Sequence, residues 1–162
     1  MQGPLTDATT AVAARALIDR IQYLTLATAD ADGRPWVSPV WFAHEDYAEF
    51  LWISRPDARH SLNVAARSAV ALVVFDSTVA SADAQAVYVE GEAEEVPADG
   101  REHAVGAYSE RSVGSGLGAL RVADVTGTAP HRLYRARAVA SFVLGANDRR
   151  VSVSLRTTGR DR

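Results

Sequence analysis

Hydrophobic and polar residues alternate along much of the chain, a pattern that predicts a protein built mainly of β-strands. In residues 87–94, for example, Val87 points to one face and Glu90 to the other. Residues 69–75 are instead apolar throughout, as expected for a strand that is covered on both faces. The strands expected from these patterns are residues 23–28, 36–43, 49–53, 69–75, 87–94, 131–144 and 150–155.

Helix-start signals predict a few helices among these strands. Thr6 or Asp7 can cap the first helix. Pro56 suits the first turn of the second helix, and Asp57 is favourable near the positive end of the helix dipole. The helices expected are residues 6–21, 56–67 and 100–113, with a short one within 117–125.

The order of these elements indicates the fold class. Strand hairpins come first, then a helix and further strands, without regular alternation of strand and helix. This order argues for a mainly β protein, an antiparallel barrel with accessory helices. We expect a single domain over residues 1–162, with residues 1–5 and 156–162 frayed.

Composition excludes several classes of function. The net charge of −3 argues against a dedicated nucleic-acid binder, which needs a clustered basic surface. Cysteine is absent, so disulfides and thiolate chemistry are excluded, and the absence of lysine excludes Schiff-base chemistry. No apolar run approaches the roughly 20 residues of a membrane span, and the N-terminus has no signal-peptide pattern. We therefore expect a soluble, cytoplasmic protein that binds no membrane.

A proline lies within the second predicted strand. Because proline cannot donate to a strand ladder, this strand is expected at a sheet edge or opening. A stacked ring would lie along its exposed backbone. An edge strand that proline merely protects from further pairing is the alternative. The residues concerned are Val37, Ser38, Pro39 and Val40.

A polar and cationic cluster follows the third strand, at the start of the second helix. It consists of Ser54, Arg55, Arg59 and His60. Arg59 and His60 would clamp a phosphate with help from Ser54 and the N–H groups of the helix end. The alternative is a solvated helix face. With the proline-bearing strand, the cluster predicts a flat aromatic ligand with a phosphate tail, and flavin mononucleotide (FMN) fits that description.

Other side chains carry weaker signals. Gln85 could offer its amide to the edge of a heterocycle, although a lone glutamine is usually a surface residue. Trp36 and Trp41 face opposite sides of their strand. One of them could line a cavity or a subunit interface, and the alternative is that both fill the core. Arg135 and Arg137 indicate an interface, an anionic substrate or, slightly preferred, an exposed barrel face.

Several kinds of site are missing from the sequence. The four histidines are dispersed without metal-ligand spacing, so no metal site is expected. No nucleophile elbow and no outstanding acid/base pair is present. If the protein is an enzyme, a cofactor carries its chemistry.

An ordered series of segments resembles the pyridoxamine 5′-phosphate oxidase-like, flavin-binding split-barrel proteins. The segments are Leu-Ala-Thr at 26–28, Asp-Gly-Arg-Pro-Trp-Val-Ser-Pro-Val-Trp-Phe at 32–42, Leu-Trp-Ile-Ser at 51–54, Arg-His-Ser-Leu-Asn-Val at 59–64, Ala-Leu-Val-Val at 71–74 and Val-Tyr-Val-Glu-Gly-Glu-Ala at 87–93. The resemblance implies a Greek-key split β-barrel like that of flavin reductases, assembled as a homodimer with two cofactor sites at the subunit interface.

The resemblance also implies roles for single residues. The strand at 37–40 would lie along the isoalloxazine ring, and Ser54, Arg59 and His60 match the phosphate-binding positions. Gln85 lies within a residue of a position that approaches the ring from the other subunit. Many relatives have lysine where this chain has His60. The segment from residue 130 lacks the tryptophan and arginine arrangement of the vitamin-processing oxidases, so pyridoxamine phosphate is not the expected substrate.

Three functions remain open at this point. The first is an FMN-dependent oxidoreductase that exchanges a hydride with a small planar substrate. The second is a reductase that uses an 8-hydroxy-5-deazaflavin coenzyme, as many lysine-poor relatives do. The third is a non-catalytic protein that binds or stores a flavin or another planar cofactor.

Overall fold

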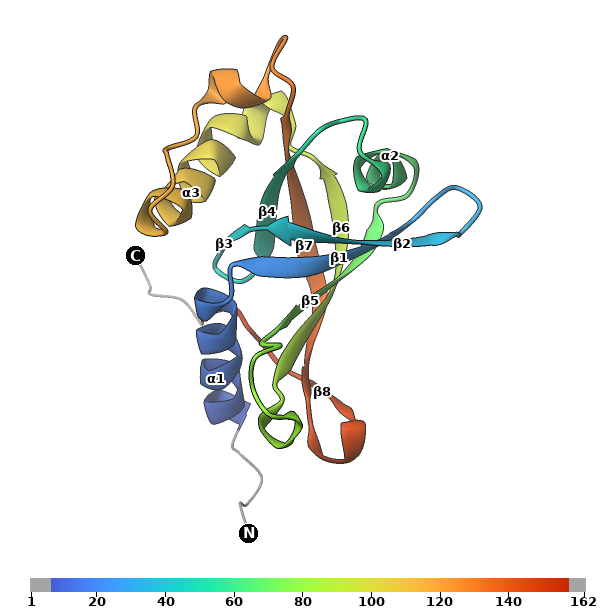
Figure 1. Ribbon diagram of the computed structural model, residues 1–162, viewed down its shortest axis with the longest axis vertical. Coiled ribbons are helices and arrows are strands. Elements are labelled where there is room, and N and C mark those ends of the chain that lie inside the picture. Colours follow the sequence, from blue (N-terminus) through green and yellow to red (C-terminus); the bar gives the residue numbers. More distant parts are fainter. Residues whose placement is uncertain (1–6, 158–162) are drawn as a thin grey trace.

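The computed structural model describes residues 7–157, which form an antiparallel β half-barrel with three α-helices around it (Figure 1). The prediction of a mainly β protein with accessory helices is thereby confirmed. The predicted cap at Thr6 and the ends 1–5 and 158–162 lie outside the described residues.

Every strand pair of the half-barrel is antiparallel. The strands follow the order β2-β1-β5-β6-β7-β4-β3, and β8 pairs with β7. Their bounds are β1 Tyr23–Ala29, β2 Pro35–Trp41, β3 Ala43–Glu45, β4 Glu49–Ser54, β5 Ala69–Phe75, β6 Ala86–Glu95, β7 Arg132–Leu144 and β8 Arg150–Ser152. The predicted strand at 150–155 is therefore shorter than expected.

The helices lie around the open ends of the half-barrel (Figure 1). The α-helices are α1 Asp7–Arg20, α2 Arg59–Ala66 and α3 Arg101–Gly114. Short 3₁₀ helices are Ser81–Asp83, Ala98–Gly100, Val122–Val125 and Ala146–Asp148. The short helix expected within 117–125 is the third of these, a single 3₁₀ turn. No helix within residues 7–157 is long and apolar enough to cross a membrane.

The predicted strand at 36–43 is in fact two strands that meet at Phe42. Up to Trp41 the chain pairs with β1, and from Ala43 it pairs with β4. Phe42 is fully buried at this switch, with its ring 6.1 Å from that of Phe50. Strand β3 continues to Glu45, and a turn at residues 46–48 leads into β4. This switch brings the two ends of the sheet together and bends it into a half-barrel.

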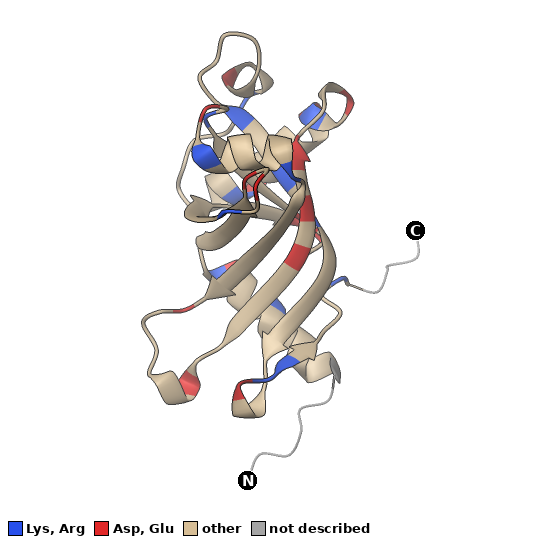
Figure 2. Ribbon diagram, turned by 90° about the vertical axis from the view of Figure 1, so that its right-hand side faces the viewer, with Lys and Arg blue, Asp and Glu red and all other residues tan. Residues whose placement is uncertain are grey.

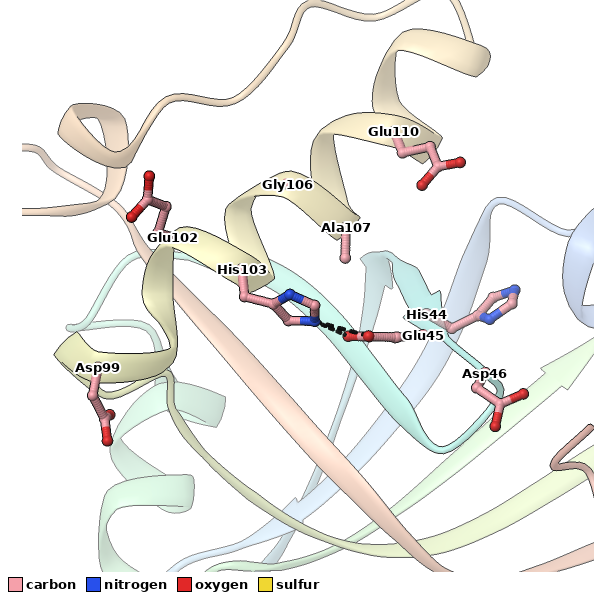
Figure 3. Close-up of a pocket in the computed structure, with 9 residues that line it drawn as sticks. All are labelled: His44, Glu45, Asp46, Asp99, Glu102, His103, Gly106, Ala107 and Glu110. Atoms are coloured by element: carbon pink, nitrogen blue, oxygen red, sulfur yellow. Dashed lines mark hydrogen bonds and ion pairs between the residues drawn. The ribbon is translucent and has the colours of Figure 1, made fainter. Parts of the chain in front are cut away.

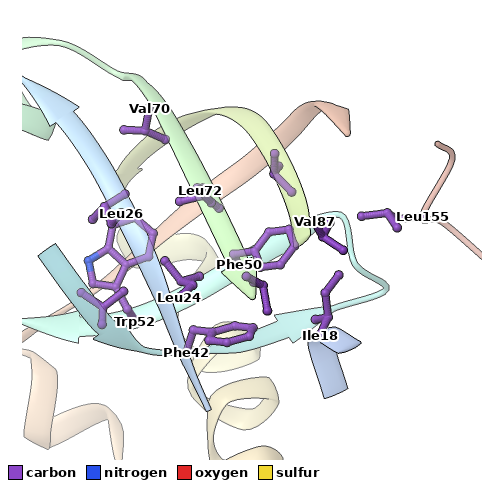
Figure 4. Packing of buried hydrophobic residues seen from close by; sticks show 14 of the residues in the cluster. Ile18, Leu24, Leu26, Phe42, Phe50, Trp52, Val70, Leu72, Val87 and Leu155 are labelled. Atoms are coloured by element: carbon purple, nitrogen blue, oxygen red, sulfur yellow. The ribbon is translucent and has the colours of Figure 1, made fainter. Parts of the chain in front are cut away.

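The hydrophobic core fills the inside of the half-barrel and extends beneath α1 (Figure 4). Its largest fully buried side chains include Leu17, Ile18, Leu24, Leu26, Phe42, Phe50, Trp52 and Leu72. A second, smaller cluster lies between α3 and strands β3, β4 and β7, and it includes Ala43, Leu51, Val105, Tyr108 and Leu133. The alternation that predicted the strands is therefore the alternation between core and outside.

The apolar strand β5 is covered on one face only within this chain, which corrects the expectation of two covered faces. Val70, Leu72 and Val74 are buried, whereas Ala71 and Phe75 are exposed. The outer side of β5 is therefore not covered by the described residues.

The outward side chains of neighbouring strands form a mainly apolar surface, at whose end the guanidinium of Arg150 lies 4.2 Å from the centre of the Tyr88 ring. Pro39 pairs with Thr25, Thr25 with Val73, and Val73 with Tyr88, so these four residues form one row across β2, β1, β5 and β6. We call Val37, Pro39, Ala71, Val73 and Tyr88 the outer face. Val37 keeps 56% of its surface exposed, which is unusual for an apolar side chain in a strand.

Arg135 and Arg137 lie where acidic and basic residues oppose each other on β6 and β7 (Figure 2). Arg135 contacts Glu94 at 2.7 Å, and Arg137 contacts Glu94 at 3.0 Å and Glu49 at 3.1 Å. Both guanidinium groups thus have carboxylate partners. The preferred interpretation, an exposed barrel face, holds for Arg137, whose side chain is 52% exposed, but not for Arg135, whose side chain is only 13% exposed.

Candidate functional site

Strand β2 forms one end of the strand order, so the prediction that Pro39 marks a sheet edge is confirmed. Val37 and Pro39 point outward and belong to the outer face, while Val40 is buried in the core. Ser38 points inward and is only 9% exposed. Of the four predicted residues on this strand, Ser38 alone brings a polar side chain to the inner side.

His60 joins three elements through its imidazole ring. Its Nδ1 lies 3.1 Å from the Ser38 hydroxyl on β2, and its Nε2 lies 2.5 Å from the Ser54 hydroxyl at the end of β4. Burial lowers the pKa of the His60 imidazole below its ordinary value. The fold therefore brings Ser38 to His60, which lies 22 residues further along the chain and already neighbours Ser54 in the sequence.

Arg59 points to the other side of the same cluster. Its guanidinium carbon lies 4.4 Å from the centre of the Trp36 ring, at a distance typical of a cation–π contact. Trp36 in turn donates its indole N–H to the Ser38 hydroxyl at 3.1 Å. Within the described chain Arg59 makes no hydrogen bond or ion pair. Its charge is therefore available to a ligand.

Arg55 does not join this cluster, although it was predicted with it. Its guanidinium forms two hydrogen bonds with Asp57, at 2.9 and 3.0 Å, and both side chains are exposed. The hydrogen bonds from Arg55 lower the pKa of the Asp57 carboxyl. Asp57 therefore neutralises Arg55 in the turn before α2, where Pro56 also lies.

The predicted start of the second helix at Pro56 is wrong. Helix α2 begins at Arg59, after an extended Ala58, and its first turn holds no acidic residue. The later start puts Arg59 and His60 in the first turn of the helix, where the free N–H groups favour an anion. Of the three predicted residues Arg55, Arg59 and His60, only Arg59 and His60 remain at the site, because Arg55 is paired with Asp57 in the turn before α2.

Asn63 and Thr28 position α2, and the sequence analysis did not identify them. Asn63 is buried and donates an N–H to the Thr28 hydroxyl at 3.0 Å. Asn63 follows Arg59 and His60 by one helical turn, so a polar side chain on the same helix face was the available signal.

An Asn63→Ala variant should be destabilised by about 1–3 kcal/mol, because it leaves the buried Thr28 hydroxyl without its donor. Urea unfolding measures the change. Leu62→Ala is the matched control on the same helix, since Leu62 is 57% exposed and its loss should change stability by less than about 0.5 kcal/mol. Equal stability of the two variants would contradict the positioning role of Asn63.

Gln85 lies far from the cluster within one chain. It precedes β6 and lines a narrow crevice beside α1 and Leu144. The ten residues of β6 separate it from the end of the strand near α2, a length of about 33 Å. If Gln85 approaches the same ligand, it must do so from a second subunit, as the resemblance implies.

A larger groove of about 750 Å³ lies elsewhere, between α3 and β3 (Figure 3). Acidic side chains dominate it, and His103 contacts Glu45 at 2.8 Å. Within the described residues no three histidine or carboxylate side chains are grouped so that they could hold a metal ion. None of the predicted site residues lines this groove.

The sequence profile of pyridoxamine 5′-phosphate oxidase matches residues 11–141, which is most of the chain. The chain belongs to the pyridoxamine 5′-phosphate oxidase-like split-barrel family. The family binds flavins, and the fold and the site described above lie within the matched residues. No curated protein sequence matches the chain.

Solved structures share the fold of this split-barrel protein. A heme-binding protein from Mycobacterium smegmatis is 19% identical with a TM-score of 0.70, covering 95% of this chain and 60% of that one. HutZ, a heme storage protein from Vibrio cholerae, is 23% identical with a TM-score of 0.61, covering 80% of this chain and 90% of that one. A FAD-binding protein from Mesorhizobium loti is 25% identical with a TM-score of 0.59, covering 82% of this chain and 92% of that one.

These structures differ in length and in what they bind. The chain spans less than two thirds of the length of the Mycobacterium smegmatis protein. The same split barrel is thus used by proteins named for heme and for a flavin. The ligand must therefore be argued from the residues at the site.

Proposed function

We propose that the chain binds FMN along the exposed edge of β2 and acts as a flavin-dependent oxidoreductase. The observation that carries this proposal is the meeting of Arg59, His60, Ser38 and Ser54 at the start of α2. An unpaired cation and free helix N–H groups suit a phosphate. The relation to a FAD-binding protein of the same fold adds support, because FAD contains the same ring system as FMN.

The roles of the residues follow from their positions. Arg59 would hold the phosphate with its free guanidinium, and Ser54 would add a hydroxyl. The exposed backbone edge at 37–40 would run beside the ring. Bound FMN would supply the redox chemistry by exchanging a hydride with a small planar substrate, and the chain would position both partners.

We place this site at the interface of a homodimer. The outer face leaves Val37 and Pro39 exposed directly beside the proposed ring position. A second copy would cover this apolar surface and bring its own Gln85 toward the site. The isolated chain has no other described element that shields the outer side of β5.

Arg59→Ala should weaken FMN binding by about 1–3 kcal/mol, the contribution of a charge-assisted hydrogen bond. This corresponds to a roughly 5- to 150-fold higher Kd in a fluorescence titration. Arg55→Ala is the matched control, because Arg55 is bound to Asp57 and should leave the Kd within about twofold. Equal effects of the two substitutions would remove Arg59 from the phosphate site.

A deazaflavin coenzyme would use the same cluster, since it also ends in anionic groups. Titration of the protein with both coenzymes separates the two proposals. Tight binding of FMN with no binding of the deazaflavin supports the first. Mass spectrometry of any small molecule that copurifies identifies the coenzyme directly.

A second candidate function is binding or storage of a planar cofactor without turnover. The heme-binding and heme-storage proteins of the same fold favour it. The number of cations argues for FMN: the cluster offers one unpaired arginine, which suits one phosphate, whereas a heme carries two carboxylates on separate arms. Stopped-flow reduction of the loaded protein, followed by an oxidant, distinguishes an enzyme from a storage protein that never cycles.

A further inference from the structure

The hydrogen bonds around His60 have a direction that follows from which groups can donate and which can accept. An indole N–H can only donate, so the Ser38 hydroxyl must accept from Trp36 at 3.1 Å. Ser38 is buried, and its second neighbour in this chain of hydrogen bonds is Nδ1 of His60 at 3.1 Å. The question is which of these two groups donates to the other.

When His60 is neutral with its proton on Nε2, every group in this series of hydrogen bonds has a partner. Ser38 then donates its proton to Nδ1, and Nε2–H donates to the Ser54 hydroxyl. The Ser54 hydroxyl proton then remains free to bond to an acceptor on a bound ligand. A protonated His60, or the neutral Nδ1–H tautomer, would instead donate from Nδ1 to Ser38, and the buried Ser38 proton would then have no acceptor among the described residues.

We infer that His60 acts as a neutral relay and not as a cation: the Trp36–Ser38–His60–Ser54 chain of hydrogen bonds presents the Ser54 hydroxyl as a donor to the anionic group of the ligand. This inference rests on the proposed function for the presence of an anion. His60 is thus a positioning residue, and Ser54 is the residue that contacts the ligand. Arg59 supplies the positive charge.

The surroundings of His60 agree with this assignment. Ser38 of β2 and Ser54 of β4 face the ring with neutral hydroxyls, and Arg59 precedes His60 on the same helix. The pKa of the Asp30 carboxyl is lowered mainly by a backbone hydrogen bond from Arg34 and to a small extent by the charge of Arg59. Arg55 is paired with Asp57. Burial lowers the pKa of His60, and a lower pKa favours the neutral ring at pH 7.

The test begins with the ring itself. Two-bond ¹H–¹⁵N spectra of histidine-labelled protein distinguish the neutral Nε2–H tautomer from the imidazolium, and loss of the signal in His60→Gln assigns it among the four histidines. We expect the neutral Nε2–H tautomer at pH 7 with and without FMN. An imidazolium in either state overturns the inference, even if FMN binds well.

Binding measurements supply a second readout. FMN is titrated between pH 7.0 and 8.5, where its phosphate stays a dianion because the second pKa is about 6. We expect a Kd that changes by less than about twofold, whereas a rise of about tenfold per pH unit, as for a required cation, would refute the relay. Ser54→Ala should raise the Kd about tenfold with His60 still neutral. An unchanged Kd in that variant would also refute it.

Trp36→Phe tests this account of the Ser38 proton. It keeps an aromatic face for Arg59 but removes the indole N–H. A hydroxyl accepts two hydrogen bonds, so Ser38 could accept from His60 with or without Trp36, and phenylalanine supplies no acceptor for the Ser38 proton. We therefore expect His60 to stay neutral and the Kd for FMN to stay independent of pH. An imidazolium at pH 7 in this variant would contradict the inference. Failure of the wild-type protein to bind FMN would instead reject the proposed function, and the spectra in the absence of ligand would still decide the state of His60.

Discussion

Phe42→Ala is expected to lower the free energy of unfolding by about 3–5 kcal/mol, the cost of removing a fully buried phenyl ring. The ring packs near Phe50, and the guanidinium of Arg111 lies 4.3 Å from its centre. Arg111 also donates to the backbone oxygens of Ile18 and Ile21, at 3.0 and 2.6 Å. Loss of the ring therefore loosens the contact between α3, the end of α1 and the strand switch.

Urea unfolding followed by tryptophan fluorescence measures this loss. Val12→Ala is the control, since Val12 is 58% exposed on α1 and its truncation should cost less than about 0.5 kcal/mol. A cost below about 1 kcal/mol for Phe42→Ala would show that the sheet bends into its half-barrel without this side chain.

Val73→Arg is expected to convert the proposed homodimer into a monomer that no longer retains FMN. Val73 lies in the middle of the row from Pro39 to Tyr88, and a second copy would bury it. An unpaired charge in a buried interface costs several kcal/mol, and a two-fold axis would place two such charges in the same interface. In the monomer the arginine remains at the surface, so the variant should still fold.

Sedimentation and FMN titration of the same samples check this result. Val12→Arg introduces the same charge on α1, away from the outer face, and should stay dimeric with its cofactor. A dimeric, FMN-loaded Val73→Arg protein would place the interface elsewhere. A wild-type monomer at micromolar concentration would reject the homodimer itself.

The proposed site lies at an exposed strand edge beside the start of a helix. Its proposed ligand contacts come from few side chains: Arg59 provides the unpaired charge, and Ser54 provides a hydroxyl held by His60. Changes at such positions can alter the ligand while leaving the core intact.

Much of the fold follows from local patterns. The alternation at 87–94 predicted β6, and Pro39 predicted an edge strand, because both depend on which side of a strand faces the core or a neighbour. The ordered segments also indicated the family, which the match over residues 11–141 confirms. The cluster of Ser54, Arg59 and His60 was predicted as a group, and the structure brings these residues together at the start of α2.

Other features depended on contacts that the pattern of hydrophobic and polar residues does not reveal. The break at Phe42 was not predicted, because the pattern of residues 36–43 is that of one continuous strand. In the structure residues before Phe42 pair with β1 and residues after it pair with β4. Arg55 was grouped with the site, although Asp57 neutralises it two residues away. Asn63 and Thr28 meet only when α2 packs onto β1.

The amino-acid sequence by itself determined the strands, the edge position of β2 and the chemical character of the cluster, because hydrophobic periodicity and proline geometry act over a few residues. The tertiary structure decided where the sheet bends, how deeply the cluster is buried and in which direction the hydrogen bonds at His60 run. These features depend on partners from separate strands and helices, whereas the ion pair that neutralises Arg55 is local and was overlooked. His60 shows this most clearly, since its ring meets Ser38 only when β2 and α2 come together.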